Sequence, residues 1–126
     1  MELTTELTIA ETAERTGLTA HTLRYYERDG LMLDVPRSTS GHRRYREGDL
    51  GWIELITRLR TTGMPIRDVR RYAQLVRAGE GNEAERLEIL CRHRDAVRAR
   101  LEAEARHLAA IERKIAVYLG EADTCH

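Results

Sequence analysis

Two short stretches in the first half of the chain concentrate side chains that can contact a nucleic acid. The first stretch contains Thr19, His21, Thr22, Arg24, Tyr25 and Arg28. The second contains Arg37, Ser40, His42, Arg43, Arg44 and Tyr45. Guanidinium groups bind phosphate oxygens and the O6 and N7 atoms of guanine, and hydroxyl groups bind phosphate oxygens. This combination predicts binding to double-stranded DNA.

The distribution of charge points in the same direction. The 126 residues include 21 basic and 21 acidic ones, so the net charge of zero neither indicates nor excludes a polyanionic partner. Between Arg37 and Arg77, however, ten arginines stand against four acidic residues, an excess of six positive charges. Only one basic residue of the chain, Lys114, is a lysine, and a GC-rich genome would also favour arginine. The local excess therefore supports the prediction only together with the motifs around it.

Catalysis is not indicated by any group of residues. The five histidines lie in dissimilar segments: His21, His42, His93, His107 and His126. An enzyme would need activated groups gathered in a pocket, and neither a nucleophile motif nor a phosphate-binding loop is present in the sequence. We expect no enzyme activity and no cofactor.

Two short helices are predicted around the first stretch. A capping-box pattern at Thr8–Glu11 opens a helix that should end at Gly17. A second helix, over residues 19–30, places Leu23 and Tyr26 on its inner face. Two short helices joined by a glycine-containing turn form a helix-turn-helix pattern. Many small helical domains contain such a pair, so the pattern alone is a weak indication of DNA binding.

The second stretch is predicted to form a β-hairpin. Proline, serine and glycine punctuate residues 34–45, with the turn at Ser40–Gly41 and arginines on both arms. A solvated hairpin needs only one or two charges, whereas this segment concentrates cations beside the helix-turn-helix. We interpret it as a basic wing. A merely polar loop is the alternative.

Two further helices complete the predicted DNA-binding domain. Apolar residues at helical spacing from Leu50 to Leu59 predict a third helix that ends at Gly63. Pro65 suits the first turn of a fourth helix, whose apolar face runs from Ile66 to Val76. The exposed amino terminus of this helix, near Arg67, could receive a phosphate group.

The last third of the chain carries a heptad pattern. The glycines at Gly79 and Gly81 divide the sequence into a DNA-binding domain, 1–79, and a dimerisation helix with a short tail, 80–126. A helix over residues 82–119 would be about 55 Å long, too long to bury one apolar stripe against so small a domain. It therefore needs a partner helix. The predicted seam comprises Leu87, Leu90, Arg94, Val97, Leu101, Glu104, Leu108, Ile111 and Ile115.

Arg94 and Glu104 interrupt this seam at core-type positions, where polar residues can set register and orientation. In an antiparallel pair of helices that cross near Ala99, Arg94 of one chain could meet Glu104 of the other. The alternative, that both side chains simply face solvent, is equally open.

These residues resemble the MerR family of bacterial transcription regulators. The motifs are Thr22 to Leu31 in the second helix, Arg37 to Tyr45 in the wing and Gly63 to Ile66 before the fourth helix. The resemblance implies a mainly α fold, with a winged helix-turn-helix head and a long helix that forms an antiparallel coiled coil in a homodimer. Such a dimer would bind a palindromic operator and activate transcription by distorting the promoter spacer for RNA polymerase. An architectural or excisionase-like DNA-binding protein without effector response is the alternative.

Individual roles follow from the same resemblance. Arg43 and Tyr45 match phosphate-contacting positions of the family, while His42 stands where a tyrosine is more common. Packing of Tyr45 between the wing and the third helix is an alternative role. Residues 111–118 are similar to the branch that responds to aldehydes and nitrosative stress, yet Arg58 stands where many of its members keep a reactive cysteine.

A sensing thiol would then have to be Cys91 or Cys125. Cys91 lies beside three cationic side chains that could lower the pKa of its thiol, but packing beside the seam is the more ordinary role. In the resemblance, metal-sensing branches of the family place cysteines at the start of the long helix and in a loop after it. Asp123, Cys125 and His126 could supply ligands at the tail, but the start of the helix has no thiol or imidazole, so no metal site is expected.

The sequence has neither a long apolar run nor the pattern of a signal peptide, so we expect a cytoplasmic protein without membrane association.

Overall fold

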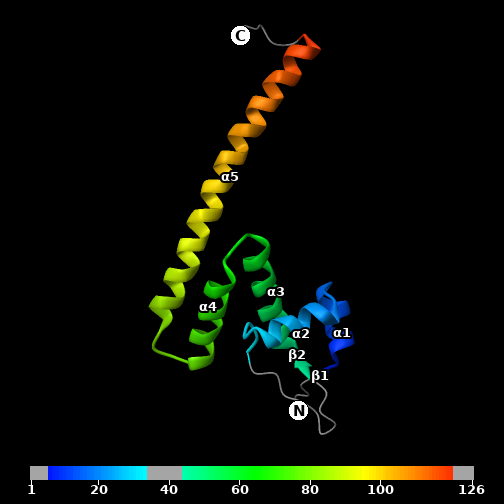
Figure 1. The fold of residues 1–126 in the computed structure, drawn as a ribbon, viewed down its shortest axis with the longest axis vertical. Helices are drawn as coiled ribbons and strands as arrows, with labels where there is room; N and C mark the ends of the chain where they lie inside the picture. Colours follow the sequence, from blue (N-terminus) through cyan, green and yellow to red (C-terminus); the bar gives the residue numbers. More distant parts are fainter. Residues whose placement is uncertain (1–5, 34–43, 121–126) are drawn as a thin grey trace. The chain divides into compact units, whose positions relative to one another are not determined.

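The computed structural model describes residues 6–33 and 44–120, and these are mainly helical (Figure 1). In chain order the elements are β1 (Glu6–Leu7), α1 (Ile9–Thr16), α2 (Ala20–Arg28), β2 (Tyr45–Arg46), α3 (Glu47–Thr61), α4 (Ile66–Ala78) and α5 (Glu83–Leu119). The chain divides into two compact units, Met1–Ile89 and Leu90–His126. The division between the two units lies within α5. The predicted boundary between a DNA-binding domain and a dimerisation helix lies after Gly79 and stays a prediction.

The helix-turn-helix is confirmed, with both helix starts and the end of α1 where the caps predict them, while α2 ends at Arg28, two residues before Gly30. Thr8 Oγ1 accepts a hydrogen bond from the Glu11 amide at 3.1 Å, and the Glu11 carboxylate accepts one from the Thr8 amide at 2.8 Å. Gly17 ends α1 in the left-handed region with φ of 78°. Thr19 then caps α2 by accepting a hydrogen bond from the amide of Thr22 at 3.0 Å. These local hydrogen bonds satisfy amides that the helices leave unpaired at their starts.

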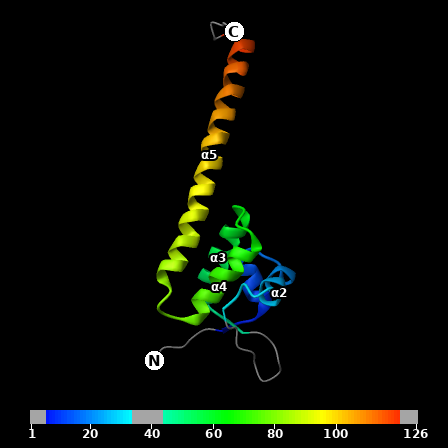
Figure 2. The same cartoon turned by 60° about the vertical axis from the view of Figure 1, so that its left-hand side comes forward.

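The core of the first unit is formed by α2, α3 and α4, and Figures 1 and 2 both show α3 and α4 side by side. The Tyr26 and Thr57 hydroxyl groups lie 3.1 Å apart in a hydrogen bond that joins α2 to α3. Trp52 stacks on Tyr72, with ring centroids 5.8 Å apart. The core includes Leu23 and Tyr26 from α2, Trp52, Ile53, Ile56 and Leu59 from α3, and Val69, Ala73 and Leu75 from α4. The inner faces predicted for α2 and α3 are confirmed except at Leu50, which is half-buried, while the burial of Trp52 and Leu75 was not predicted.

The two described strands form an antiparallel pair in which Glu6 lies opposite Arg46 and Leu7 opposite Tyr45. The partner of β2 is thus a segment that precedes α1, which the sequence analysis did not predict. A strand of two residues is too short to produce an alternating pattern. The hairpin predicted around Ser40–Gly41 lies outside the described residues.

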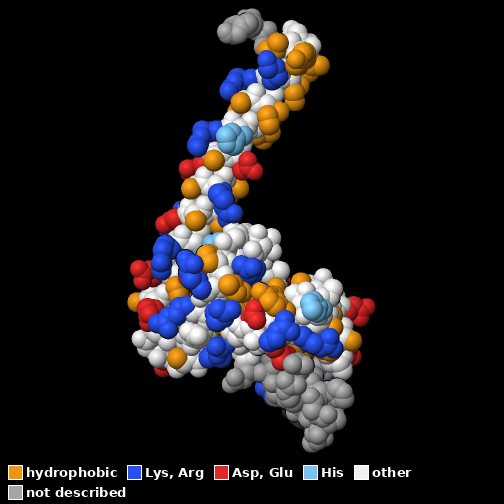
Figure 3. All heavy atoms as spheres, viewed as in Figure 1, with side chains coloured by type: hydrophobic (Ala, Val, Ile, Leu, Met, Phe, Trp, Pro, Cys, Tyr) orange, Lys and Arg blue, Asp and Glu red, His pale blue; other side chains and the backbone are white. Residues whose placement is uncertain are grey.

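Helix α5 has 37 residues, and none of them is buried in the single chain. Its length and limits agree with the predicted dimerisation helix. Exposed fractions reach 64% for Leu101, 54% for Leu108 and 57% for Ile111. Figure 3 shows hydrophobic side chains along this helix. No helix in the described ranges has both the length and the apolar composition that a bilayer-spanning segment requires.

We expect Ile56→Ala to lower the free energy of unfolding by about 2–5 kcal/mol, because the Ile56 side chain is fully buried and its removal leaves a cavity. Arg58→Ala, on the exposed side of the same helix, is the matched control and should change that free energy by no more than about 0.5 kcal/mol. Urea unfolding followed by circular dichroism measures both. Equal losses in the two variants would contradict the assigned core.

Candidate nucleic-acid interface

The outer face of α2 carries the predicted DNA-contacting side chains. His21, Arg24 and Arg28 are exposed, while Thr22 and Tyr25 are half-buried. The Arg28 guanidinium lies 5.8 Å from the centre of the Tyr25 ring, a distance compatible with a cation–π contact. Figure 3 shows Lys and Arg side chains gathered on the first unit. This face can present guanidinium groups to phosphates or to base edges.

Two threonines at the start of α2 have structural partners as well. The Thr19 hydroxyl donates to Thr22 Oγ1 at 3.0 Å and accepts from the Thr22 amide. Thr19 remains exposed, so the cap leaves it at the surface of the helix N-terminus. A helix N-terminus is also favourable for a phosphate group, because its amides point outward.

The structure corrects the predicted direct phosphate contact of Tyr45. This side chain has no exposed surface, and its hydroxyl group donates a hydrogen bond of 2.7 Å to Glu27 Oε2. A fully buried phenol cannot reach a phosphate oxygen outside the protein. Tyr45 therefore packs in the core and joins β2 to α2. The alternative weighed from the sequence was also a packing role, but against the third helix.

The remaining predicted contacts divide into two groups. Arg44 is half-buried just before β2, and Arg67 is exposed near the start of α4, where its Nε lies 3.8 Å from Asp68 Oδ1. The other wing residues lie outside the described ranges: Arg37, Ser40, His42 and Arg43.

A set of side-chain donors that the sequence analysis missed holds the segment after α2. We call Trp52, Arg70 and Arg77 the carbonyl clamp, because each donates to backbone oxygens in residues 29–32. The hydrogen bonds run from Arg70 Nε to Asp29 O at 2.8 Å, from Trp52 Nε1 to Leu31 O at 2.8 Å, and from Arg77 Nη1 to Gly30 O at 3.2 Å and Met32 O at 2.6 Å. The spacing of Arg70 and Arg77 by two helical turns was a possible signal, but it does not identify their acceptors.

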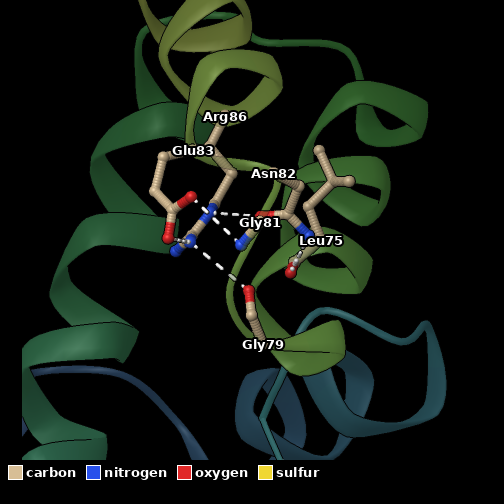
Figure 4. A network of polar contacts seen from close by, with 6 residues as sticks. All are labelled: Leu75, Gly79, Gly81, Asn82, Glu83 and Arg86. Atoms are coloured by element: carbon tan, nitrogen blue, oxygen red, sulfur yellow. Dashed lines mark hydrogen bonds and ion pairs between the residues drawn. The ribbon is translucent and has the colours of Figure 1, made fainter.

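A second polar network, shown in Figure 4, joins α4 to the start of α5. Asn82 Nδ2 donates to Leu75 O at 2.9 Å, and Arg86 Nε donates to Asn82 Oδ1 at 2.8 Å. The Glu83 carboxylate accepts from the Gly81 amide at 3.1 Å. Hydrogen bonding to its own backbone amide and then to that of Gly81 holds the pKa of Glu83 below its ordinary value. We call this set of contacts the α4–α5 joint.

The predicted dimerisation residues all lie on α5. Leu90 and Val97 are half-buried in the single chain, and the other apolar members, Leu87, Leu101, Leu108, Ile111 and Ile115, are exposed. Glu104 is exposed too, and Arg94 Nε donates to Asp95 Oδ1 at 3.0 Å. This hydrogen bond raises the pKa of Arg94 above its ordinary value. The pairing of Arg94 with a partner's Glu104 stays a prediction.

Cys91 is a half-buried free thiol on α5, and Cys125 lies outside the described residues. In the described part of the chain, no three His, Cys, Asp or Glu side chains are grouped as a metal ion would require.

The same elements are found in known proteins. The model of the MerR helix-turn-helix regulatory proteins matches residues 7–75, from β1 to α4. The chain belongs to the MerR family. The predicted resemblance is thereby confirmed, and this MerR-family chain is a transcription regulator rather than an enzyme.

Individual relatives cover the long helix as well. The chain is 35% identical over 111 residues to an uncharacterised helix-turn-helix regulator of Haemophilus influenzae, covering 88% of this chain and 82% of that one. It is 43% identical to the regulator AdhR of Bacillus subtilis over 70% of this chain, a match that spans only 63% of AdhR. The crystal structure of HiNmlR, a MerR-family regulator lacking the sensor domain and bound to promoter DNA, aligns with a TM-score of 0.84, 34% identity and 92% coverage of both chains.

We expect Tyr45→Phe to lower the free energy of unfolding by about 1.5 kcal/mol, because the Glu27 carboxylate loses a short hydrogen bond. Tyr25→Phe removes a hydroxyl from a half-buried ring on α2 and should cost no more than about 0.5 kcal/mol. Guanidinium unfolding of both variants checks the difference. A larger effect at Tyr25 would show that Tyr45 is not the residue that fastens β2 to α2.

Proposed function

We propose that this MerR-family protein binds a palindromic promoter operator in double-stranded DNA as a homodimer. The observation that carries the proposal is the outer face of α2, where Arg24 and Arg28 are exposed beside Tyr25 on a capped and anchored helix. Such a helix can enter the major groove and present guanidinium groups to guanine. The likeness to HiNmlR, which was crystallised on promoter DNA, supports the same assignment.

The proposed DNA contacts combine this helix with the basic wing. They are Thr19, His21, Thr22, Arg24, Tyr25 and Arg28 on or beside α2, Arg37, Ser40, His42, Arg43 and Arg44 in the wing region, and Arg67 on α4. Tyr45 acts within this set through Glu27 of α2, without touching DNA itself.

The homodimer is proposed from the apolar stripe of α5. An isolated helix that leaves Leu101, Leu108 and Ile111 more than half exposed gains stability by covering them with a second helix. An antiparallel coiled coil of two copies would do so, and would bring Arg94 near the partner's Glu104. A two-fold symmetric dimer in turn calls for a palindromic operator.

Activation is proposed from the family to which the chain belongs. We infer that the dimer distorts the spacer between promoter elements so that RNA polymerase can use them, and that it acts in the cytoplasm, where bacterial promoter DNA lies. An architectural or excisionase-like DNA-binding protein is the second candidate. The long apolar stripe of α5 favours the regulator, because a DNA-binding module that does not dimerise needs no such stripe.

Selection of bound duplexes from a random DNA pool tests this function. We expect a palindrome with two half-sites to be enriched, because two α2 helices related by symmetry read the same sequence on opposite strands. Enrichment of an asymmetric single site, or of no sequence at all, would contradict the proposal.

Dimerisation can be tested by placing charge in the stripe. Leu101→Asp combined with Leu108→Asp should produce monomers at micromolar concentration and weaken operator binding, since buried carboxylates oppose coiled-coil packing. Sedimentation velocity measures the assembly state. The control, Arg106→Asp, changes charge on the helix face opposite the seam and should leave a dimer. A wild-type monomer, or a dimeric double mutant, would exclude this interface.

Base recognition by α2 can be tested with Arg24→Ala. If the Arg24 guanidinium contacts a base, its loss should cost about 1–3 kcal/mol on the selected operator and relax the preference at one position in each half-site. Arg106→Ala removes the same charge from α5 and should leave the preference unchanged. Competition binding on operator variants measures both. Equal losses for Arg24→Ala on operator and random DNA would assign this side chain to the phosphate backbone instead.

A further inference from the structure

The segment that follows α2 is held by its backbone oxygens. Four consecutive carbonyl groups, from Asp29 to Met32, accept hydrogen bonds from the carbonyl clamp at 2.6–3.2 Å. The side chains of Leu31 and Met32 are at the same time buried in the core, with 0% and 4% of their surface exposed. The position of the segment is therefore determined from two sides, by apolar packing and by hydrogen bonds.

The chemistry of the clamp suits this place in the fold. The carboxyl end of a helix carries unpaired carbonyl groups and a partial negative charge, and cationic donors are favourable there. Arg77 Nη1 donates to two carbonyl groups at once, from a guanidinium group that stays positively charged. The segment that directly follows α2 is thus attached to α4 through charge-assisted hydrogen bonds.

Helix α4 is also attached to the start of α5, through a second set of polar contacts. Leu75 O accepts from Asn82 in the α4–α5 joint, and Arg71 on α4 forms an ion pair of 2.9 Å with Glu85. A continuous series of polar contacts therefore runs from the end of α2 through α4 to the first turns of the proposed dimerisation helix.

We infer that Trp52, Arg70 and Arg77 are positioning residues that set where α2 lies relative to α4 and the start of α5. This inference rests on the proposed function: a dimer engages both half-sites only if its two recognition helices keep a separation near a multiple of one DNA turn, about 34–36 Å. The clamp removes the freedom of α2 to shift within each protomer. The carbonyl clamp therefore contributes to discrimination between the operator and other DNA, and not to the attraction between positive side chains and phosphates.

Arg77 is the position at which this role can be separated from folding. The Arg77 contact with Gly30 O is exposed and that with Met32 O only partly buried, so water can reach the first of these oxygens when the guanidinium is removed. Arg77→Met keeps the apolar stem of the side chain and removes its donors. Arg77→Lys keeps the charge but places its three N–H donors on one nitrogen at the end of a shorter side chain. Arg106→Met, on the exposed far side of α5, is the matched loss of one positive charge.

Binding is measured at one salt concentration on the duplex selected as operator and on a scrambled duplex. We expect Arg77→Met to weaken binding to the operator about tenfold or more and binding to the scrambled duplex by less than about threefold. Binding to the scrambled duplex depends on attraction between positive side chains and phosphates, which does not require a fixed position of α2. Arg77→Lys should be intermediate, and Arg106→Met should keep the wild-type ratio. An unchanged ratio in Arg77→Met, or equal losses on both duplexes, would overturn the inference.

Amide hydrogen exchange provides the second measurement, without DNA. The Leu31 amide donates to Tyr26 O at 2.9 Å, and its exchange should accelerate at least tenfold in Arg77→Met while the amides of α3 keep their protection. An unchanged exchange rate at Leu31 would contradict the inference that the carbonyl clamp fixes the position of this segment. If the wild type bound neither duplex, the proposed function would fail, and the exchange result would still decide whether the clamp holds this segment.

Discussion

The interface depends on how a nine-residue helix is held in place. A helix as short as α2 is not stable alone in water, so its position comes from its attachments to the rest of the first unit. Leu23 and Tyr26 are buried on its inner face, and Thr19 caps its start. Glu27 accepts a hydrogen bond from the buried Tyr45. These contacts leave Arg24 and Arg28 on the outer face, where a DNA groove can receive them.

The carbonyl clamp extends this attachment beyond the end of α2. Arg70 and Arg77 come from the same helix, so the orientation of α2 follows that of α4, and α4 is in turn tied to the start of α5.

The predictable parts of this fold are those that local chemistry determines. The caps at Thr8 and Thr19 and the stop at Gly17 were readable because each acts within four residues, and the inner faces of α2 and α3 followed from helical spacing. The burial of Tyr45 and the β1–β2 pair could not be predicted in the same way. Both depend on contacts between residues far apart in sequence, and a tyrosine in a basic segment suits either DNA or a core.

The carbonyl clamp could not be predicted from the sequence either. Arginines on a helix face are equally suited to phosphates, carboxylates or backbone oxygens, and only the packed structure shows that Arg70 and Arg77 have carbonyl acceptors. Part of the arginine excess that suggested DNA binding therefore serves the protein itself. Arg24 and Arg28 of α2, by contrast, are exposed.

The account is tested most directly by hydroxyl-radical footprinting of the protein on its selected operator. It predicts two protected patches on one face of the duplex, related by two-fold symmetry and with centres about one helical turn, or a multiple of it, apart. A single protected patch, or protection spread evenly along the duplex, would contradict sequence reading by a symmetric pair of α2 helices.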